Sequence, residues 1–340
     1  MKKNFFLIIF FTATLFFTVG CGNVEEVQNT NEDFKKVRMM IMTSGTDSGI
    51  NTKVAKKISD EMKKETGGNV VIEIYPNDKL TGGNTGRGVQ MVVNGSADMA
   101  VYTSGTFSML DPEIALPTLP WVFTNYEDVR QIMNDTGDDF YRKIFAENGL
   151  VYLGATHNGF RQISNNRNPV HNPEDLSQMK IRILGNDVCR RFFQALGADP
   201  IPMSRSEMEI GLKEGTIDGH DMGLHQSGSA NLDKIERYVT LLNYSYENYI
   251  FVINTKIFNQ LEPRTRELLL KKSKEACEWG CDIIEKSDHH MKYRFKKNGV
   301  QITELTPQEF EIFKNKTRPM LEELKTQYSE DALKAFKIDR

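Results

Sequence analysis

The chain has 340 residues, with 43 lysines and arginines against 46 aspartates and glutamates, so its formal net charge is −3 at pH 7. A balance this close to neutral, with the basic residues spread along the chain, argues against nucleic acid as a partner. The length suffices for two lobes with separate hydrophobic cores.

The first residues have the composition of an export signal. Lys2 and Lys3 precede an apolar run from Phe5 to Val19, and small residues follow the run. This order is typical of a secretory signal peptide, and the run is shorter than the roughly 20 residues of a membrane-spanning helix. We expect residues 1–21 to be an export signal and the protein to act in the periplasm or another extracytoplasmic compartment.

Thr18-Val19-Gly20-Cys21 resembles the cleavage box of bacterial lipoproteins, in which the cysteine is lipidated after processing. Thr18 departs from that pattern, which usually has leucine there. We predict a lipid on Cys21 that anchors the protein to a membrane, the alternative being ordinary cleavage and a soluble secreted product. The polar residues 22–37 are then a flexible tether.

The remaining cysteines indicate neither a disulfide framework nor a metal site. Cys277 and Cys281 are one helical turn apart, and Cys189 stands alone. None has the spacing of metal ligands. We expect all three to be small packing residues, and we expect no metal or cofactor.

Strands alternate with helices from the start of the mature chain. Ile50, Val54, Ile58 and Met62 recur every four residues, which predicts one face of a helix. The alternation predicts crossover units on a largely parallel sheet. The expected strands are 37–42, 70–75 and 99–102, and a second helix lies around 89–93.

The alternation restarts in the second half of the chain. We expect strands at 150–155, 179–184 and around Ile217, helices at 188–196 and 207–213, and extended runs at 238–242 and 249–253 that cross between lobes.

A long helix follows these runs. It starts at Pro263, which suits a first helical turn, and meets no breaker before Gly299. Its length of about 50 Å exceeds one small lobe, so we expect it to lie across both. A last helix opens at Thr306 and is interrupted near Pro319.

These elements predict an α/β, two-lobe fold like that of periplasmic binding proteins, with crossing strands and a long helix spanning both lobes. The expected boundaries are 38–158 plus about 250–275 for lobe I, 159–249 plus about 276–325 for lobe II, and 326–340 for a tail.

Two arginines are the first candidates for a binding site. Arg161 and Arg182 flank short apolar runs that we expect to be strands. In open α/β sheets, ligands bind beyond the carboxyl ends of the strands, and a guanidinium matches a carboxylate as a planar fork of donors. The alternative for each, taken alone, is a solvated arginine at a strand end.

The order of several short motifs resembles that of the solute-binding subunit of tripartite ATP-independent periplasmic (TRAP) transporters, the DctP family. The resemblance covers nearly all of residues 38–325. Its motifs are Thr66-Gly67-Gly68, Ile74-Tyr75-Pro76, Gly95-Ser96-Ala97-Asp98-Met99, Leu119-Pro120-Trp121-Val122-Phe123, Gly159-Phe160-Arg161-Gln162, Lys180-Ile181-Arg182, Gly197-Ala198-Asp199-Pro200-Ile201-Pro202 and Gly215-Thr216-Ile217-Asp218-Gly219.

This resemblance implies a receptor that closes on an organic acid anion and delivers it to a membrane permease driven by an ion gradient. It implies that Arg182 pairs with the ligand carboxylate and that Arg161 also lines the pocket. Two alternatives to transport remain. A sensor that signals to a membrane partner would use the same lobes, whereas an exported enzyme is disfavoured because no catalytic motif is present.

Three departures from the family pattern concern ligand choice. His220-Asp221-Met222 replaces a common Gln-Glu-Asn, which makes Asp221 and Met222 candidate pocket residues. Arg205 stands where an aromatic residue is frequent, and Arg87 lies in a glycine-rich stretch that usually carries an acidic residue. We expect Arg205 or Arg87 to favour a ligand with two carboxylates or extra oxygens, the alternative being surface arginines.

Two loops that follow expected strands supply further candidates for binding ligand oxygens, although solvation of these loops is the alternative. They contain Thr46, Asp47, Thr103 and Ser104.

Overall fold

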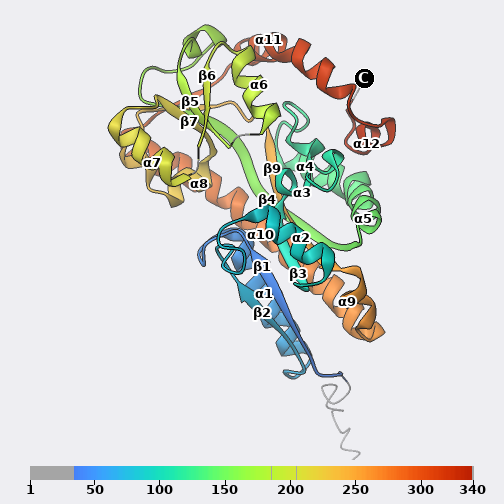
Figure 1. Cartoon of the computed structure of the whole chain (residues 1–340). Coiled ribbons are helices and arrows are strands. Elements are labelled where there is room, and N and C mark those ends of the chain that lie inside the picture. The colour runs from blue at the N-terminus through green and yellow to red at the C-terminus, as the bar shows by residue number, and fades with distance from the viewer. Residues whose placement is uncertain (1–33, 185, 204, 339–340) are drawn as a thin grey trace, which may run out of the picture.

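The computed structural model describes residues 34–184, 186–203 and 205–338 (Figure 1). The expected export signal, Cys21 and most of the expected tether lie outside the described residues. Within these residues, no helix combines the length and apolar composition needed to cross a bilayer.

The described strands form one sheet in the order β2-β1-β3-β9-β4-β7-β5-β6, with β8 pairing with both β4 and β10. Strands β1, β2 and β3 are parallel to one another, as are β5, β6 and β7. The long strands β4 and β9 run antiparallel between these two blocks. The strands are β1 (Val37–Thr43), β2 (Val70–Tyr75), β3 (Met99–Thr103), β4 (Leu150–Asn165), β5 (Lys180–Ile183), β6 (Asp199–Pro202), β7 (Gly219–Gly223), β8 (Tyr238–Leu241), β9 (Tyr246–Asn254) and β10 (Gln301–Glu304).

Strand β4 is longer than the sequence pattern predicts, because it joins both lobes. Its first part pairs with β9, and its last part pairs with β7 and β8. The β4–β9 register shifts next to Gly154 and Gly159, whose φ angles are 146° and 111°. Such angles are accessible to glycine at little cost, and irregularities of this kind bend a strand. Arg161 therefore lies inside a continuous strand rather than at the start of one.

Helices cover the sheet and follow the expected alternation, with two differences. Helix α11 continues through Pro319, because Thr317, Met320 and Leu321 on either side are buried against the core. The expected tail contains α12, and Phe336 after it packs edge-on against Phe123. The α-helices are α1 (Ile50–Glu65), α2 (Thr85–Asn94), α3 (Ser104–Phe107), α4 (Tyr126–Ile132), α5 (Asp138–Glu147), α6 (Asp187–Ala195), α7 (Arg205–Glu214), α8 (Leu224–Ser229), α9 (Thr255–Gln260), α10 (Pro263–Lys297), α11 (Pro307–Lys325) and α12 (Glu330–Ala335). The 3₁₀-helical turns are η1 (Pro112–Thr118), η3 (Pro173–Leu176) and η4 (Leu232–Lys234), and η2 (Met133–Gly137) is π-helical.

Helix α10 is the spine that the sequence predicts, and it passes across the whole molecule (Figure 1). Its 35 residues pack on α1 and β4 and, further along, on α8 and β10. Leu269, Ala276 and Ile284 belong to the core of the first lobe, whereas Phe295 packs with Val239 in the second. Crossing strands and spine together confirm the predicted fold class.

Close packing of the spine depends on Gly280. A Cβ atom at this position would lie 2.6 Å from Cγ2 of Val54 and would collide with the Thr156 hydroxyl. We predict that Gly280→Ala lowers the free energy of unfolding by about 1–3 kcal/mol, because overpacking outweighs the gain in helix propensity. Urea unfolding measures the effect, with Lys271→Ala on an exposed position of the same helix as the control. Equal stability of the Gly280→Ala variant and the parent would contradict this account.

Candidate functional site

Arg161 is at the centre of a buried cluster of charges. The residue is 5% exposed, and Asp221 is fully buried beside it. Nε of Arg161 donates to Oδ1 and Oδ2 of Asp221 at 2.9 and 2.8 Å, and Nη2 donates to the Asp221 backbone oxygen at 2.8 Å. Nη1 donates to Oε2 of Glu247 at 3.2 Å. One guanidinium therefore ties together β4, β7 and β9.

The two carboxylates keep Arg161 charged inside the protein. Burial would lower the pKa of the guanidinium, but Asp221 and Glu247 raise it well above its usual value. Burying the charge is tolerable because it is paired and hydrogen-bonded. Three of its five N–H groups bond within the described residues, which leaves one on Nη1 and one on Nη2.

Arg182 lies on β5 and is 2% exposed. Its Nε donates to the backbone oxygen of Met203 at 2.9 Å. The strand register pairs Arg182 with His220, so these two side chains share a face of the sheet. Arg161 is on the opposite face, with Asp221. Because β7 lies between β4 and β5 in the sheet, the two arginines do not lie on adjacent strands.

A cleft of about 550 Å³ separates the loop after β1 from helices α7 and α8. Asn158 and Tyr249 from the crossing strands also line it. Its remaining lining residues come from the two sides, namely Ser44, Gly45, Thr46, Ser48, Gly49, Ile50 and Asn51 from one side, and Glu209, His225, Gln226 and Ser229 from the other.

Hydrogen bonds link this cleft to the Arg161 cluster. Nε2 of Gln226 donates to Oδ1 of Asn158 at 2.8 Å, and Nδ2 of Asn158 donates to Oε2 of Glu247 at 2.9 Å. The same oxygen of Glu247 accepts from Arg161. A ligand that displaces Gln226 from Asn158 would thus disturb bonds that reach the buried guanidinium.

The amino end of α1 gives the cleft an anion-attracting wall. Gly49 at this end lacks a capping side chain, and the first turn contains no acidic residue. The first N–H groups of a helix lack backbone partners within it, and the helix dipole places partial positive charge there. In α1 the Thr52 N–H already donates to Oδ1 of Asn51 at 3.0 Å, so the N–H groups of Ile50 and Asn51 are the ones offered to an anion. A carboxylate oxygen is a suitable acceptor for these groups.

Only some of the other candidate residues lie at the cleft. Thr46 lines the cleft, and Asp47 is exposed on the same loop. Met222 packs with Met208 and Leu212 in an apolar cluster and is not among the residues that line the cleft. Arg87 is exposed on α2, and Arg205 begins α7 with a side chain outside the described part.

Thr103 and Ser104 stand at the start of α3. The Thr103 hydroxyl accepts from the Thr106 N–H at 3.2 Å. Ser104 is fully buried, and its hydroxyl has no hydrogen-bond partner among the described residues. Neither residue lines the cleft.

Sequence reasoning missed Asn158 and Glu247. Asn158 directly precedes the Gly159-Phe160-Arg161 motif, which could have drawn attention to it, but no sequence signal brings Glu247 to Arg161. Among the described residues, no group of three or more His, Cys, Asp and Glu side chains is arranged to hold a metal ion.

We predict that Arg161→Met lowers the free energy of unfolding by about 3–5 kcal/mol, because it leaves Asp221 and Glu247 buried without their counter-ion. Chemical denaturation of the variant and the parent measures the difference. Arg87→Met, at an exposed position, should change stability by less than about 0.5 kcal/mol. An Arg161→Met variant as stable as the parent would show that the cluster does not depend on this charge.

Comparison with known proteins agrees with the fold and the motifs. A 2,3-diketo-L-gulonate-binding periplasmic protein of Escherichia coli K12 is 28% identical over 288 residues, which cover 84% of this chain and 87% of that protein. The C4-dicarboxylate-binding protein DctB of Bacillus subtilis 168 is 27% identical over 82% of this chain and 79% of its own length.

Among solved structures, a TRAP periplasmic solute-binding protein of Ralstonia eutropha H16 with bound (S)-2-acetolactate superimposes with a TM-score of 0.82. The two are 25% identical, and the match covers 88% of this chain and 98% of the other. The family model DctP, described as bacterial extracellular solute-binding protein, family 7, matches residues 41–327. This chain therefore belongs to the DctP family of solute-binding proteins.

Proposed function

We propose that this protein is an extracytoplasmic receptor for an organic acid anion, which it delivers to a TRAP-type membrane permease. The observation that carries the proposal is the cleft between the uncapped amino end of α1 and the elements linked to buried Arg161. The relatives described above bind a diketo sugar acid, C4-dicarboxylates and acetolactate, all of which carry a carboxylate.

Arg182 is the proposed carboxylate anchor, reached from the cleft when the lobes close, because it is not among the residues that line the cleft itself. Arg161 lies on the opposite face of the sheet and is proposed as its helper chiefly by holding the strands in position. Three of the five N–H groups of Arg161 already donate to Asp221 and Glu247. The remaining N–H groups could donate to one further acceptor. The main effect of Arg161 is to hold β4, β7 and β9 in place. A charge-assisted hydrogen bond contributes about 1.5–3 kcal/mol, so a bidentate contact to Arg182 would dominate the affinity for a small acid.

The described lining of the cleft favours an acid with hydroxyl or keto groups. It offers the hydroxyls of Ser44, Thr46 and Ser48 and the amides of Asn51 and Asn158, but no lysine or arginine. Hydroxyls and amides hydrogen-bond to sugar hydroxyls and ketones. The second carboxylate of a dicarboxylate would have to pair with Arg205 or Arg87, and Arg87 is exposed.

Binding proceeds by closure of the two lobes around the anion. The β1 loop contributes from one lobe and α8 from the other, so the ligand completes contacts that neither lobe makes alone. The crossing strands and α10 connect the lobes and limit the motion to a bend, and closure expels water. Export and lipidation of Cys21 would keep the receptor beside the permease.

We predict that Arg182→Ala abolishes binding and that Arg182→Lys weakens it by about ten- to a hundredfold, because a point charge cannot replace a planar fork. Isothermal titration measures the dissociation constants, after unfolding curves confirm that each variant is folded. Lys180→Ala, at an exposed position of the same strand, is the control. Unchanged affinity in the lysine variant would contradict bidentate recognition by Arg182.

A thermal-shift screen with mono-, di-, keto- and sugar acids identifies the ligand class. An acid present at 100 times its dissociation constant should add about 2.7 kcal/mol of stability. Stabilisation by hydroxy or keto acids above simple dicarboxylates is the expected result. If no acid raised the melting temperature while neutral sugars or cations did, the proposed function would be refuted.

Cys21→Ser should move the protein from the membrane fraction to the soluble extracytoplasmic fraction, because serine cannot take the thioether-linked lipid. Cell fractionation followed by immunoblotting measures the distribution. The same distribution for parent and variant would rule out a lipid anchor at this position while leaving the binding proposal intact.

A further inference from the structure

The ligand cleft contains one imidazole, that of His225 on α8, among its described lining residues. Nδ1 of His225 lies 2.6 Å from the Ser287 hydroxyl. Its Nε2 has no hydrogen-bond partner among the described residues, and it is not one of the unpartnered side-chain atoms that are closed off from solvent. The protein therefore holds one ring nitrogen and leaves the other accessible at the cleft.

Asp288 on α10 fixes the backbone that carries this imidazole. Oδ1 of Asp288 accepts from the His225 N–H at 3.0 Å, and Oδ2 accepts from the Tyr126 hydroxyl of α4. Helix α8 has no side-chain cap of its own, so the carboxylate supplies an acceptor for its first turn. At the other end of α8, Nη1 of Arg294 donates to the Gly228 backbone oxygen at 3.0 Å. The spine helix thus holds α8 at both ends.

His225 is neutral in the free protein at pH 7. Burial, followed by the positive charge of Lys53 on α1, lowers the pKa of its imidazole below the ordinary value of 6.5. Burial also raises the pKa of Asp288 to about 6, although the hydrogen bonds that it accepts oppose this rise. At pH 7 the carboxylate of Asp288 is therefore ionised and can accept from both of its donors.

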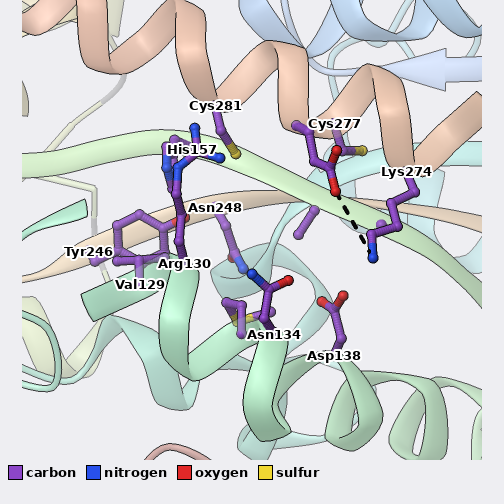
Figure 2. Close-up of a pocket in the computed structure, with 14 residues that line it drawn as sticks. Val129, Arg130, Asn134, Asp138, His157, Tyr246, Asn248, Lys274, Cys277 and Cys281 are labelled. Carbon is purple, nitrogen blue, oxygen red and sulfur yellow. Dashed lines mark hydrogen bonds and ion pairs between the residues drawn. The ribbon is translucent and has the colours of Figure 1, made fainter. Parts of the chain in front are cut away.

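Other titratable groups face this part of the molecule from neighbouring elements. Glu209 on α7 lines the cleft. His157 on β4 acts on Asp288 by its charge, and it lines a separate cavity on the other face of the crossing strands (Figure 2). Burial, followed by the charge of Asp288, raises the pKa of Tyr126 well above its ordinary value, so this hydroxyl stays a donor. Because histidine is the side chain that ordinarily titrates near neutral pH, His225 is the described lining residue suited to change its charge there.

An organic anion in the cleft would favour the charged form of His225. An opposite charge within a few ångströms raises the pKa of an imidazole. Both nitrogens of an imidazolium are donors, so Nδ1 can donate to the Ser287 hydroxyl oxygen while Nε2 donates to an oxygen of the ligand. The described lining contains no lysine or arginine that could supply this positive charge instead.

We propose that His225 takes up a proton when the organic anion binds and donates from Nε2 to a ligand oxygen, while Asp288 is the positioning residue that holds α8 for this contact. The inference rests on the proposed function and adds a proton to the species that the receptor takes up. Because the bound state holds this proton more tightly than the free state, the affinity for the anion rises as the pH falls and levels off below the pKa of the free imidazole.

Isothermal titration of the mature protein with galactonate, a hydroxy acid of the expected class, tests the coupling. Titrations at pH 6.5 in two buffers of different ionisation enthalpy give the number of protons taken up for each anion. We expect at least about 0.3 protons for the parent and fewer than about 0.1 for His225→Gln, whose amide can donate but cannot titrate. The acid that stabilises the protein most in the thermal-shift screen replaces galactonate if galactonate does not bind.

The pH profile of the affinity provides a second readout. The affinity of the parent should rise about tenfold between pH 8 and pH 5.5, and that of His225→Gln by less than about twofold. His290→Gln, at an exposed position of α10, is the matched control and should behave as the parent does. The NMR signal of His225, identified by its loss in His225→Gln, should titrate below pH 6.5 in the free protein and about one pH unit higher with the anion bound.

Asp288→Asn separates positioning from proton uptake. An asparagine oxygen cannot accept from Tyr126 and the His225 N–H with the two-sided geometry of a carboxylate, because its Nδ2 is a donor. We expect binding to weaken about three- to tenfold at each pH, while the proton count stays within about 0.1 of the parent value.

Three results would each overturn the proposal, namely no proton uptake by the parent, equal affinity at pH 8 and pH 5.5, and uptake that persists in His225→Gln but disappears in Asp288→Asn. If no acid bound at any pH, the proposed function would fail together with this inference. An acid that bound with the same affinity at every pH would refute the proton coupling alone.

Discussion

The packing of α10 on the crossing strands β4 and β9 is the constraint on which the rest of the structure depends. Each crossing strand contributes to both lobes, and α10 buries residues in the core of each. We therefore expect the lobes to move relative to one another by bending at the strand irregularities beside Gly154 and Gly159, rather than by separating or sliding. A receptor that must close and reopen needs such a limited motion.

Strands β4 and β9 contribute residues to a different cavity on each face of the sheet. Asn158 and Glu247 connect the ligand cleft to Arg161 through hydrogen bonds. The buried guanidinium of Arg161 therefore also fixes the position of cleft residues. His157 and Asn248, one position away on each strand, instead line a cavity between these strands and helices α4, α5 and α10.

Much of the fold could be predicted because local signals agree with tertiary structure. Pro263 and the absence of a breaker before Gly299 define α10 within two residues at each end. The exceptions have tertiary causes. Helix α11 tolerates Pro319 because residues on both sides of it are buried, and α12 is fixed by aromatic packing of Phe336. The length of β4 depends on pairing with strands from two lobes, which no local window contains.

The site was less predictable than the fold. Motifs identify Arg161 and Arg182 as important, but the sequence does not show that Asp221 pairs with Arg161 rather than contacting a ligand. Met222 follows Asp221 and therefore faces the other side of the sheet, where apolar residues surround it. The cysteines show the same limit. His157 and Thr156, more than a hundred positions away, lower the pKa of Cys281, whereas burial raises the pKa of Cys277 one helical turn earlier.

A crystal structure of the mature protein with the acid that stabilises it most tests the central claim directly. We predict the ligand carboxylate within about 3 Å of the Arg182 guanidinium, with the loop of residues 44–49 closed over the anion. A carboxylate bound away from both Arg182 and Arg161, or a ligand held without lobe closure, would contradict it.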